Sequence, residues 1–223
     1  MKKNFKRNSS KRKVPTSFLG KTWHFIWHDD SILSWFVNVI LAFLIVKFIF
    51  YPLLSLALGS SLPLVAVTSS SMEHRVSSSG DVNSICGTSV DFSGRPSFDV
   101  WWSVCGKWYE ENTNISFEEF KSFPMTRGFN KGDIILLVGT NNLEVGDVIV
   151  FQAAKEYPII HRIINISEDN IVTKGDNNQG LIVDSQLNER RVSPSVVLGK
   201  AYLRIPYLGY VKIWFTDFIN LFR

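Results

Sequence analysis

Residues 32–54 read ILSWFVNVILAFLIVKFIFYPLL and divide the chain into a short basic part and a longer part rich in β-type sequence. Lys47 is the only charged residue between Ile32 and Val67. A helix that crosses a membrane needs roughly 20 apolar residues, and a lysine near its end can extend its side chain toward the interface. The stretch therefore predicts one transmembrane helix over residues 31–51, and Pro52, Gly59 and Pro63 predict that the helix does not continue far.

The basic N-terminus orients this predicted helix. Residues 1–13, MKKNFKRNSSKRK, contain seven Lys or Arg residues and no acidic residue. Such a run binds nucleic acid or anionic lipid, or holds a terminus in the cytoplasm. Because an apolar stretch follows, the positive-inside rule predicts that residues 1–30 are cytoplasmic, that the later residues are extracytoplasmic, and that nucleic acid is not a partner. A buried helix of a soluble protein is the alternative, whereas a cleaved secretory signal is disfavoured because its apolar region spans only roughly 7–15 residues.

The extracytoplasmic part reads as short β-strands separated by Gly, Asn, Asp and Pro. The strand-like stretches are LPLVAVTS (62–69), KGDIILLVG (131–139), VGDVIVFQ (145–152), YPIIHRIINIS (157–167), NIVTKGD (170–176) and VVLGKAYLRIPYLGYV (196–211). We therefore predict a mainly β domain over residues 60–206. The sequence has no Rossmann or phosphate-loop glycine pattern and no Cys/His metal spacing, so neither a cofactor nor a metal is predicted.

Residues 75–128 differ in composition from these strands and are predicted to form an irregular insertion. The first half is rich in Ser and Gly, the second half is aromatic, and ISFEEFKSF (115–123) predicts a short helix. The aromatic residues either contact a membrane surface or pack into a small core. Cys86 and Cys105 lie here, and an extracytoplasmic pair either forms a disulfide, worth roughly 3 kcal/mol for a loop of this length, or remains as two free thiols.

The last residues, 207–223, combine apolar side chains with Lys212 and Asp217. This stretch is short for a second membrane span. It is typical of an amphipathic segment that lies on the membrane, and we predict one here. An ordinary helix that packs on the β domain is the alternative.

Serine and histidine residues outside the membrane are the candidates for chemistry. The predicted topology leaves His74 and His161, of the four histidines, on the same side as the serines of VTSSSMEH (67–74). A serine hydroxyl becomes a good nucleophile when a base removes its proton and a third group orients that base. Asp176, in the turn TKGDNN, is a candidate for the third group. Each residue alone also has an ordinary explanation, since a lone histidine in an apolar strand is usually a core residue and an aspartate after glycine usually forms a turn.

Six segments nonetheless resemble, in their order, those of type I signal peptidases. The segments are SSSMEH (69–74), GFNKGDIILLV (128–138), VGDVIVF (145–151), PIIHRIINI (158–166), VTKGDNN (172–178) and GKAYLRIPYLGYV (199–211). They are similar to the archaeal and endoplasmic-reticulum branch, in which a histidine replaces the bacterial catalytic lysine. The resemblance implies a coiled, partly open β-barrel-like domain on one N-terminal helix, and a serine endopeptidase that needs no metal or cofactor.

The resemblance also implies roles for individual residues. Ser71, the serine before Met72, would be the nucleophile, and His161 would be the general base that later protonates the leaving amine. The hydroxyl of Ser69 and the backbone N–H of Ser71 would form the oxyanion hole, where each donor is worth roughly 3–4 kcal/mol. Asp176 matches the acid of the family's Lys-Gly-Asp-Asn-Asn motif and is expected to be essential.

Three positions depart from the family's pattern. Ser70 stands between the two serines, where the family usually has glycine. His74 stands where proline is usual, and its closeness to the nucleophile makes it a rival base. The family's second acid is expected about six residues after the first, but that position is Ile182 here. Asp184 is therefore the candidate for the direct partner of His161.

The resemblance implies that the chain removes N-terminal signal peptides from secreted precursors, cutting after small residues at the outer surface of the cell membrane. The strand PLVAVT (63–68) is a candidate edge for binding the precursor by β-addition. The implied partners are the precursors, the lipid bilayer and, as a further candidate, the protein translocation channel. Two other functions stay open: a catalytically silent β-domain that scaffolds secretory components, and a peptidase for one dedicated class of precursor such as a pilin or flagellin.

Overall fold

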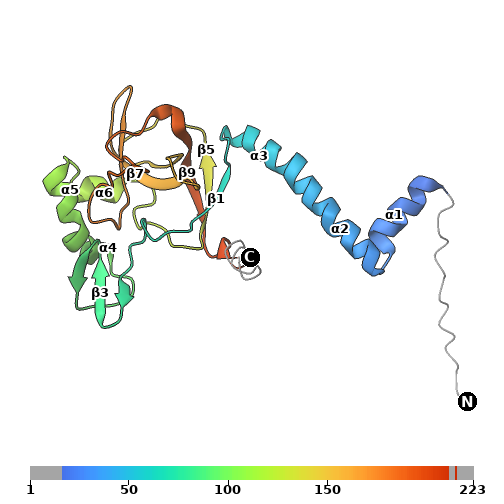
Figure 1. The fold of residues 1–223 in the computed structure, drawn as a ribbon, viewed down its shortest axis with the longest axis horizontal. Helices are drawn as coiled ribbons and strands as arrows, with labels where there is room; N and C mark the ends of the chain where they lie inside the picture. The colour runs from blue at the N-terminus through green and yellow to red at the C-terminus, as the bar shows by residue number, and fades with distance from the viewer. Residues whose placement is uncertain (1–16, 211–213, 215–223) are drawn as a thin grey trace, which may run out of the picture. The chain divides into compact units, whose positions relative to one another are not determined.

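The structure is a computed structural model that describes residues 17–210 and residue 214 (Figure 1). The chain forms two compact units, residues 1–53 and residues 54–223, and each is described by itself. The most basic part of the N-terminus lies outside the described residues. So does the predicted amphipathic segment beyond residue 210, apart from Trp214, and its membrane association stays a prediction.

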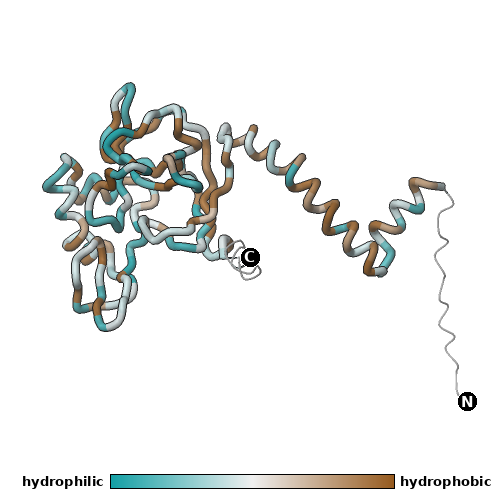
Figure 2. Tube along the Cα trace, in the orientation of Figure 1, coloured by the Kyte–Doolittle hydropathy of each residue, from teal (hydrophilic) through white to brown (hydrophobic). Residues whose placement is uncertain are grey.

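The apolar stretch forms one helix, as predicted, but the helix is longer than the sequence suggested. It comprises α2 (Ile32–Ile45), the π-helical turn η1 (Val46–Phe50) and α3 (Tyr51–Leu58). These 27 residues are long and apolar enough to cross a membrane, and Figure 2 shows hydrophobic residues along most of the length. A shorter helix, α1 (Phe18–His28), precedes it and accepts hydrogen bonds from Ser34 and Asn38 at its last carbonyls.

The helix continues past Tyr51, the predicted end of the span, and the turn before Pro52 explains how it does so. Proline lacks an N–H and its ring clashes with the carbonyl four residues earlier, which normally breaks a helix. Here the preceding turn is the π-helix η1, whose i→i+5 bonding widens the backbone at this point. The helix instead ends at Gly59, whose φ of +64° is the left-handed conformation common after a helix C-terminus.

The second unit is built on a six-stranded antiparallel sheet, which confirms the predicted β domain. The strands are β1 (Leu64–Ala66), β5 (Ile134–Val138), β6 (Val148–Phe151), β7 (Ile159–Ile166), β8 (Ile171–Lys174) and β9 (Val197–Ile205). Their order in the sheet is β1-β5-β9-β6-β7-β8. In the part of the chain that the structure describes, β1 and β8 do not pair with each other, so the sheet does not close into a barrel.

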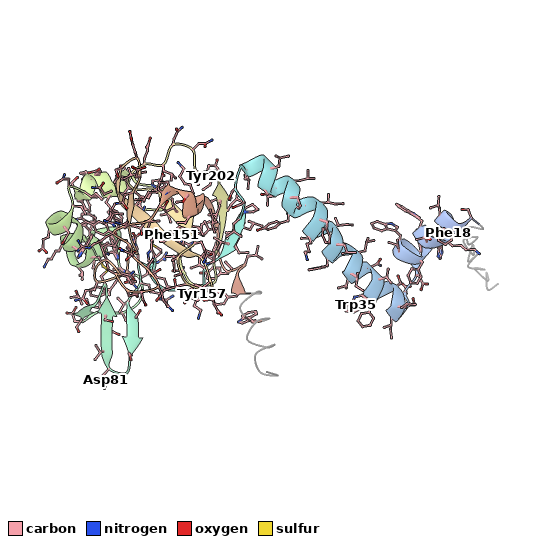
Figure 3. All side chains as sticks on the ribbon, turned by 45° about the horizontal axis from the view of Figure 1, so that its top comes forward. Phe18, Trp35, Asp81, Phe151, Tyr157 and Tyr202 are labelled. Carbon is pink, nitrogen blue, oxygen red and sulfur yellow. A yellow bond between two sulfur atoms is a disulfide. The ribbon has the colours of Figure 1, made fainter. Side chains whose placement is uncertain are left out.

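Two hydrophobic clusters cover this sheet and hold the segments on which the site is built. All four residues of β6 are buried: Val148 and Val150 belong to one cluster, and Ile149 and Phe151 to the other. Figure 3 places Phe151 within the unit. A strand covered on both faces reads as a continuous apolar run, as VIVF does. The first cluster also contains Met72 and the second contains Leu187, so each anchors a loop outside the sheet.

The insertion is regular, contrary to our prediction. A three-stranded antiparallel sheet of β2 (Ser77–Ser79), β3 (Val82–Ile85) and β4 (Thr88–Val90) comes first, with Asp81 at a hairpin tip (Figure 3). The helical elements α4 (Phe98–Trp101), η2 (Trp102–Gly106), α5 (Lys107–Asn112) and α6 (Phe117–Ser122) follow and gather beside the small sheet (Figure 1). The last of these confirms the predicted short helix.

The aromatic residues of the insertion form a small core, which was one of the two expected arrangements. Trp101, Tyr109 and Phe120 are fully buried, and the rings of Trp101 and Phe120 lie 5.3 Å apart. A disulfide joins Cys86 to Cys105 with a Cα–Cα distance of 5.7 Å, which was one of the two expected alternatives. The insertion therefore carries its own covalent crosslink, and its aromatic cluster also packs on Ile164 of β7.

Candidate active site

The segment that carries Ser71 is held on both sides by the β domain. Before it, the backbone N–H of Val67 donates to the carbonyl of Asp133 (2.9 Å). After it, Met72 is buried in the first sheet cluster, and its carbonyl accepts from the N–H of Phe129 (3.1 Å). The hydroxyl of Ser71 is thus presented between two fixed points, at the end of the edge strand β1.

Ser71 and His161 line the same cavity, whose volume is about 170 Å³. The hydroxyls of Ser69 and Ser71 are 3.1 Å apart, within hydrogen-bond distance. The walls come from the edge strand β1 and from the chain that leads into β7. The lining residues besides the two serines and the histidine are Val65, Ala66, Val67, Thr68, Lys155, Tyr157, Pro158, Ile159, Ile160, Asn178, Ile182 and Leu187.

His161 lies on β7 and is oriented by a buried glutamate. Its Nδ1 is 2.5 Å from Oε1 of Glu189, and the two side chains are 4% and 0% exposed. The second carboxylate oxygen of Glu189 accepts from the backbone N–H of Ile182 (2.5 Å). The opposite ring nitrogen, Nε2, lies close to Gly175, because a Cβ atom at that position would be 2.9 Å from it. Because the Glu189 carboxylate accepts a hydrogen bond from Nδ1, the proton stays on Nδ1, and Nε2 is the nitrogen able to accept a further proton.

A hairpin places Glu189 beneath the histidine. The N–H of Glu189 donates to the carbonyl of Ile182 (3.0 Å), and the N–H of Asp184 donates to the carbonyl of Leu187 (2.8 Å). Positions 182 and 189 therefore face each other across the two arms. Where the family's pattern has an acid at about position 182, this chain supplies a backbone N–H there and brings its carboxylate from the opposite arm.

The sequence did not single out Glu189, and Asp184 does not meet His161. The side chain of Asp184 is exposed at the hairpin turn, where its carboxylate accepts from the backbone N–H groups of Gln186 and Leu187. These two hydrogen bonds lower the pKa of Asp184. One sequence signal could have pointed to Glu189. The turn-forming run Asp-Ser-Gln (184–186) predicts a hairpin, and such a hairpin brings positions 182 and 189 opposite each other.

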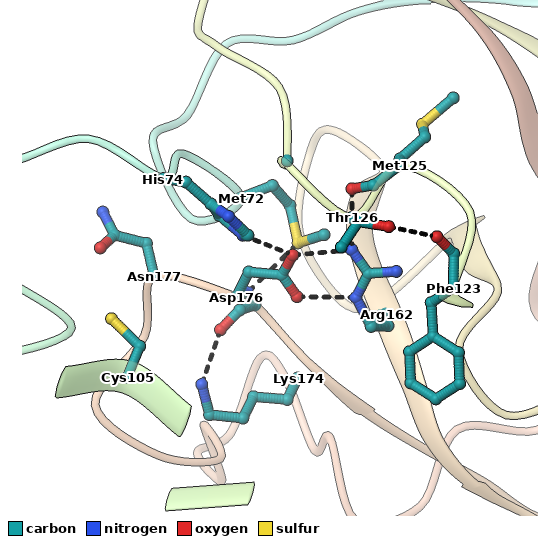
Figure 4. A network of polar contacts seen from close by, with 12 residues as sticks. Met72, His74, Cys105, Phe123, Met125, Thr126, Arg162, Lys174, Asp176 and Asn177 are labelled. Carbon is teal, nitrogen blue, oxygen red and sulfur yellow. Dashed lines mark hydrogen bonds and ion pairs between the residues drawn. The ribbon is translucent and has the colours of Figure 1, made fainter. Parts of the chain in front are cut away.

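Asp176 is the centre of a separate buried network (Figure 4). The guanidinium of Arg162 donates to both of its oxygens, at 2.9 and 2.8 Å, and Nε2 of His74 lies 3.0 Å from Oδ2. The hydroxyl of Tyr109 donates to Oδ1 at 3.2 Å. Burial alone would raise the pKa of Asp176, but the charge of Arg162 and the hydrogen bonds from His74 and Arg162 hold it well below its usual range. This carboxylate therefore joins the insertion to the sheet rather than touching His161.

His74, the rival base, belongs to this network and does not line the cavity. Its ring stacks on that of Trp101 at a centroid distance of 3.7 Å, and its side chain is 4% exposed. Burial lowers the pKa of His74 and outweighs the opposing effect of Asp176. Nε2 of His74 donates to the ionised carboxylate of Asp176, so this ring nitrogen is already engaged in a structural hydrogen bond.

Two further polar groups come close to the cavity from the loop after β8. The ammonium of Lys174 donates to the carbonyls of Gly175 (2.9 Å) and Asn178 (2.7 Å), and burial lowers its pKa to about 8. The Nδ2 atom of Asn178 is buried and has no hydrogen-bond partner among the described residues. Because Asn178 lines the cavity, this amide is available to a bound molecule or to water. No cluster of three or more His, Cys, Asp or Glu residues in the described chain is placed to hold a metal ion.

The chain is similar to catalytic subunits of signal peptidase complexes. The chain is 36% identical over 105 residues to the signal peptidase complex catalytic subunit SEC11 of Lachancea thermotolerans. It is 31% identical over 102 residues to the SEC11 subunit of Saccharomyces cerevisiae strain YJM789. Each match covers 42% of this chain and 61% of the relative, so the chain spans about three fifths of the length of these curated relatives. No family model matches the chain. Its homologues are thus catalytic subunits of signal peptidase complexes.

Proposed function

We propose that this chain is a membrane-anchored serine endopeptidase that removes N-terminal signal peptides from secreted precursors. One observation carries the proposal: Ser71 and His161 line one small cavity, and a buried carboxylate holds the Nδ1 side of that histidine. A nucleophile, a base and an orienting acid are the three parts of a serine peptidase site. The similarity to SEC11 subunits supports the same activity.

Each group has a defined task in the proposed reaction. Nε2 of His161 takes the proton of the Ser71 hydroxyl while Oγ attacks the carbonyl carbon of the scissile peptide bond. The carboxylate of Glu189 stabilises the imidazolium and keeps Nδ1 protonated. The hydroxyl of Ser69 and the N–H of Ser71 stabilise the oxyanion. The C–N bond then breaks as the histidine gives its proton to the leaving amine, and a water molecule hydrolyses the acyl-enzyme ester by the same steps.

The position of the cavity supports binding of an extended peptide beside Ser71. The cavity, of about 170 Å³, lies between β1 and the chain that leads into β7. One wall is β1, an edge strand that pairs only with β5 among the described strands. An extended peptide can therefore add to β1 and place its scissile carbonyl beside Ser71. The signal peptide, by this proposal, binds as an additional strand and is cut after the residue that enters the cavity.

The apolar helix supports a membrane location. A span at Ile32–Leu58 would place the substrate's apolar segment and the catalytic unit in one plane, which raises their effective concentration. The basic N-terminus favours an orientation with residues 1–30 in the cytoplasm and the catalytic unit outside. By this proposal the partners are the precursors, the lipid bilayer and the protein translocation channel, in a cell membrane of the archaeal type.

Cleavage of a purified precursor by the full chain in liposomes tests this proposal. We expect wild type to release the mature protein with the N-terminus generated by cutting after a small residue, as read by mass spectrometry. Ser71→Ala and His161→Ala should each lower kcat by at least about 10³-fold, because neither leaves a complete nucleophile–base pair. Ser78→Ala and His28→Ala, at exposed sites, are the matched controls. An inactive wild type, or an active Ser71→Ala variant, would favour the silent-scaffold alternative.

A further inference from the structure

Asn177 makes three hydrogen bonds that join the nucleophile segment to the insertion. Its backbone N–H donates to the carbonyl of Ser71 (2.8 Å), and its Nδ2 donates to the carbonyl of Ser70 (3.2 Å). On the opposite side its Oδ1 accepts from the backbone N–H of Cys86 (3.0 Å). One side chain therefore lies between the proposed catalytic serine and a cysteine of the disulfide.

The bond to Ser70 has a direct consequence for the proposed oxyanion hole. The carbonyl of Ser70 and the N–H of Ser71 belong to one planar peptide unit and point in opposite directions. The carbonyl of Ser70 also accepts from the backbone N–H of Glu73 (3.0 Å), so the side chain of Asn177 adds a second hydrogen bond to it. Because the peptide unit is planar, hydrogen bonds that fix the carbonyl of Ser70 also fix the direction of the Ser71 N–H. The neighbouring residue is serine where relatives usually have glycine, but the hydrogen bond is made by the backbone and does not depend on the side chain at position 70.

Cys86 is itself a fixed point. The disulfide ties it to Cys105, which is buried in the aromatic cluster of the insertion. The backbone at Cys86 has φ = 51°, a left-handed conformation that is uncommon for a residue with a side chain. Sγ of Cys86 also lies 3.4 Å from the carbonyl oxygen of Asp176, the residue before Asn177. The crosslink thus lies against the same loop that holds the serine segment.

We propose that Asn177 is a positioning residue that couples the Cys86–Cys105 disulfide to the orientation of the Ser71 backbone N–H. The proposal rests on the peptidase function proposed above and deepens it. The disulfide fixes the N–H of Cys86, Cys86 fixes the amide of Asn177, and that amide fixes the peptide unit between Ser70 and Ser71. By this proposal the insertion helps to hold the oxyanion hole in its working geometry.

The kinetics of three variants test whether the side chain of Asn177 positions the peptide unit between Ser70 and Ser71. Asn177→Asp keeps an acceptor for Cys86 but loses the donor to Ser70, and Asn177→Ala loses both. Each should lower kcat by about 10–100-fold with KM within twofold of wild type, since a misaligned oxyanion donor affects the transition state and costs up to about 10²–10³-fold when lost entirely. Asn112→Ala, whose amide only donates to the carbonyl of Trp108 on an exposed helix, is the control and should match wild type.

A double-variant cycle tests whether the Cys86–Cys105 disulfide acts through Asn177. The Cys86→Ser/Cys105→Ser protein, assayed at a temperature where its circular dichroism matches wild type, should show a lowered kcat. Adding Asn177→Ala to it should lower kcat no further, because both changes release the same peptide unit. Full additivity of the two effects, or a change confined to KM, would overturn the coupling.

Hydrogen exchange at positions 73 and 177 separates failure of this inference from failure of the proposed function, because their backbone N–H groups donate to the carbonyls of Ser70 and Ser71. Asn177→Ala should increase exchange of both amides whether or not the protein cuts a precursor, while Asn112→Ala should not. If wild type is inactive but exchange increases, the positioning role stands and the peptidase function fails. If wild type is active and exchange and kcat are both unchanged in Asn177→Ala, the positioning role is wrong.

Discussion

At the scale of single residues, the orienting carboxylate is where this site differs from the sequence pattern of its relatives. Glu189 holds Nδ1 of His161 with one oxygen and the N–H of Ile182 with the other. A carboxylate fixed at both oxygens has one orientation, so the histidine ring has one as well. The resemblance led us to expect an aspartate near position 182 as the partner of His161, and the carboxylate that contacts His161 is that of Glu189, from the other arm of a hairpin.

We expect Glu189→Gln to lower kcat by about 10²–10⁴-fold while KM changes little. The amide oxygen can still accept from Nδ1, but the neutral side chain no longer stabilises the imidazolium and also permits the wrong tautomer. Asp184→Asn is the matched control and should retain wild-type turnover, because that carboxylate contacts only its own turn. Steady-state cleavage of a fluorescent precursor measures both. A Glu189→Gln enzyme as fast as wild type, or a slow Asp184→Asn enzyme, would reverse the assignment of the two acids.

The serines and the histidine were predictable as candidates from the sequence, whereas their acidic partner was not. Ser71 and His161 stand in segments whose order resembles a known family, and they line one cavity. The position of Glu189 depends on the register of a hairpin. Turn geometry and packing set that register, and the spacing of residues in the sequence does not reveal it. Asp176 was expected to be essential for chemistry, and the structure instead surrounds it with Arg162, His74 and Tyr109.

At the scale of elements, the insertion was predicted least well. Short strands of Ser and Asn have little hydrophobic alternation, so β2 and β3 gave no periodic signal. The aromatic run was ambiguous between a membrane surface and a core until burial was known. The continuation of the helix past Pro52 was also not evident from the sequence. Proline usually ends a helix, and only the π-helical turn before it explains why this helix continues.

The aromatic cluster should be a major source of stability for the second unit. Phe120 is fully buried, lies within 5.3 Å of three other aromatic rings, and faces the guanidinium of Arg162 at 4.8 Å. We expect Phe120→Ala to lower the free energy of unfolding by about 3–5 kcal/mol through lost burial and an unfilled cavity. Urea denaturation followed by tryptophan fluorescence measures this. Phe92→Ala, at a partly buried position on the edge of the same cluster, should cost less. Equal losses at the two positions would contradict a packed core centred on Phe120.

At the scale of the whole molecule, one buried ion network joins three parts of the second unit. His74 follows the serine segment, Tyr109 belongs to the insertion, and Arg162 lies on β7 next to His161. All three contact the carboxylate of Asp176. Removing one member of such a network leaves the others buried without a partner, which costs far more than an exposed ion pair would. His74 therefore has a structural role in this network.

This network makes the stability of the unit depend on pH through His74. Burial lowers the pKa of His74 in the folded protein below the ordinary value of about 6.5, so on acidification the unfolded chain takes up a proton that the folded chain refuses. The free energy of unfolding should therefore fall as pH decreases through about 6.5, by at most about 1.4 kcal/mol per pH unit from this group. Asp176, whose pKa is held well below its usual range, stays ionised across this interval and adds no slope.

Urea denaturation at intervals between pH 8 and pH 5.5 tests this dependence. His74→Gln keeps a donor for Asp176 but cannot titrate, so its stability should be lower than wild type at pH 8 and should change less as the pH falls. His28→Gln, which removes a histidine exposed on α1, should keep the wild-type slope. Other titrating groups are common to all three proteins and cancel in the comparison. If His74→Gln loses stability on acidification as steeply as wild type, His74 adds no slope and burial does not hold it neutral. If the variant loses stability more steeply than wild type, the contact between His74 and Asp176 is instead an ion pair that strengthens as the pH falls.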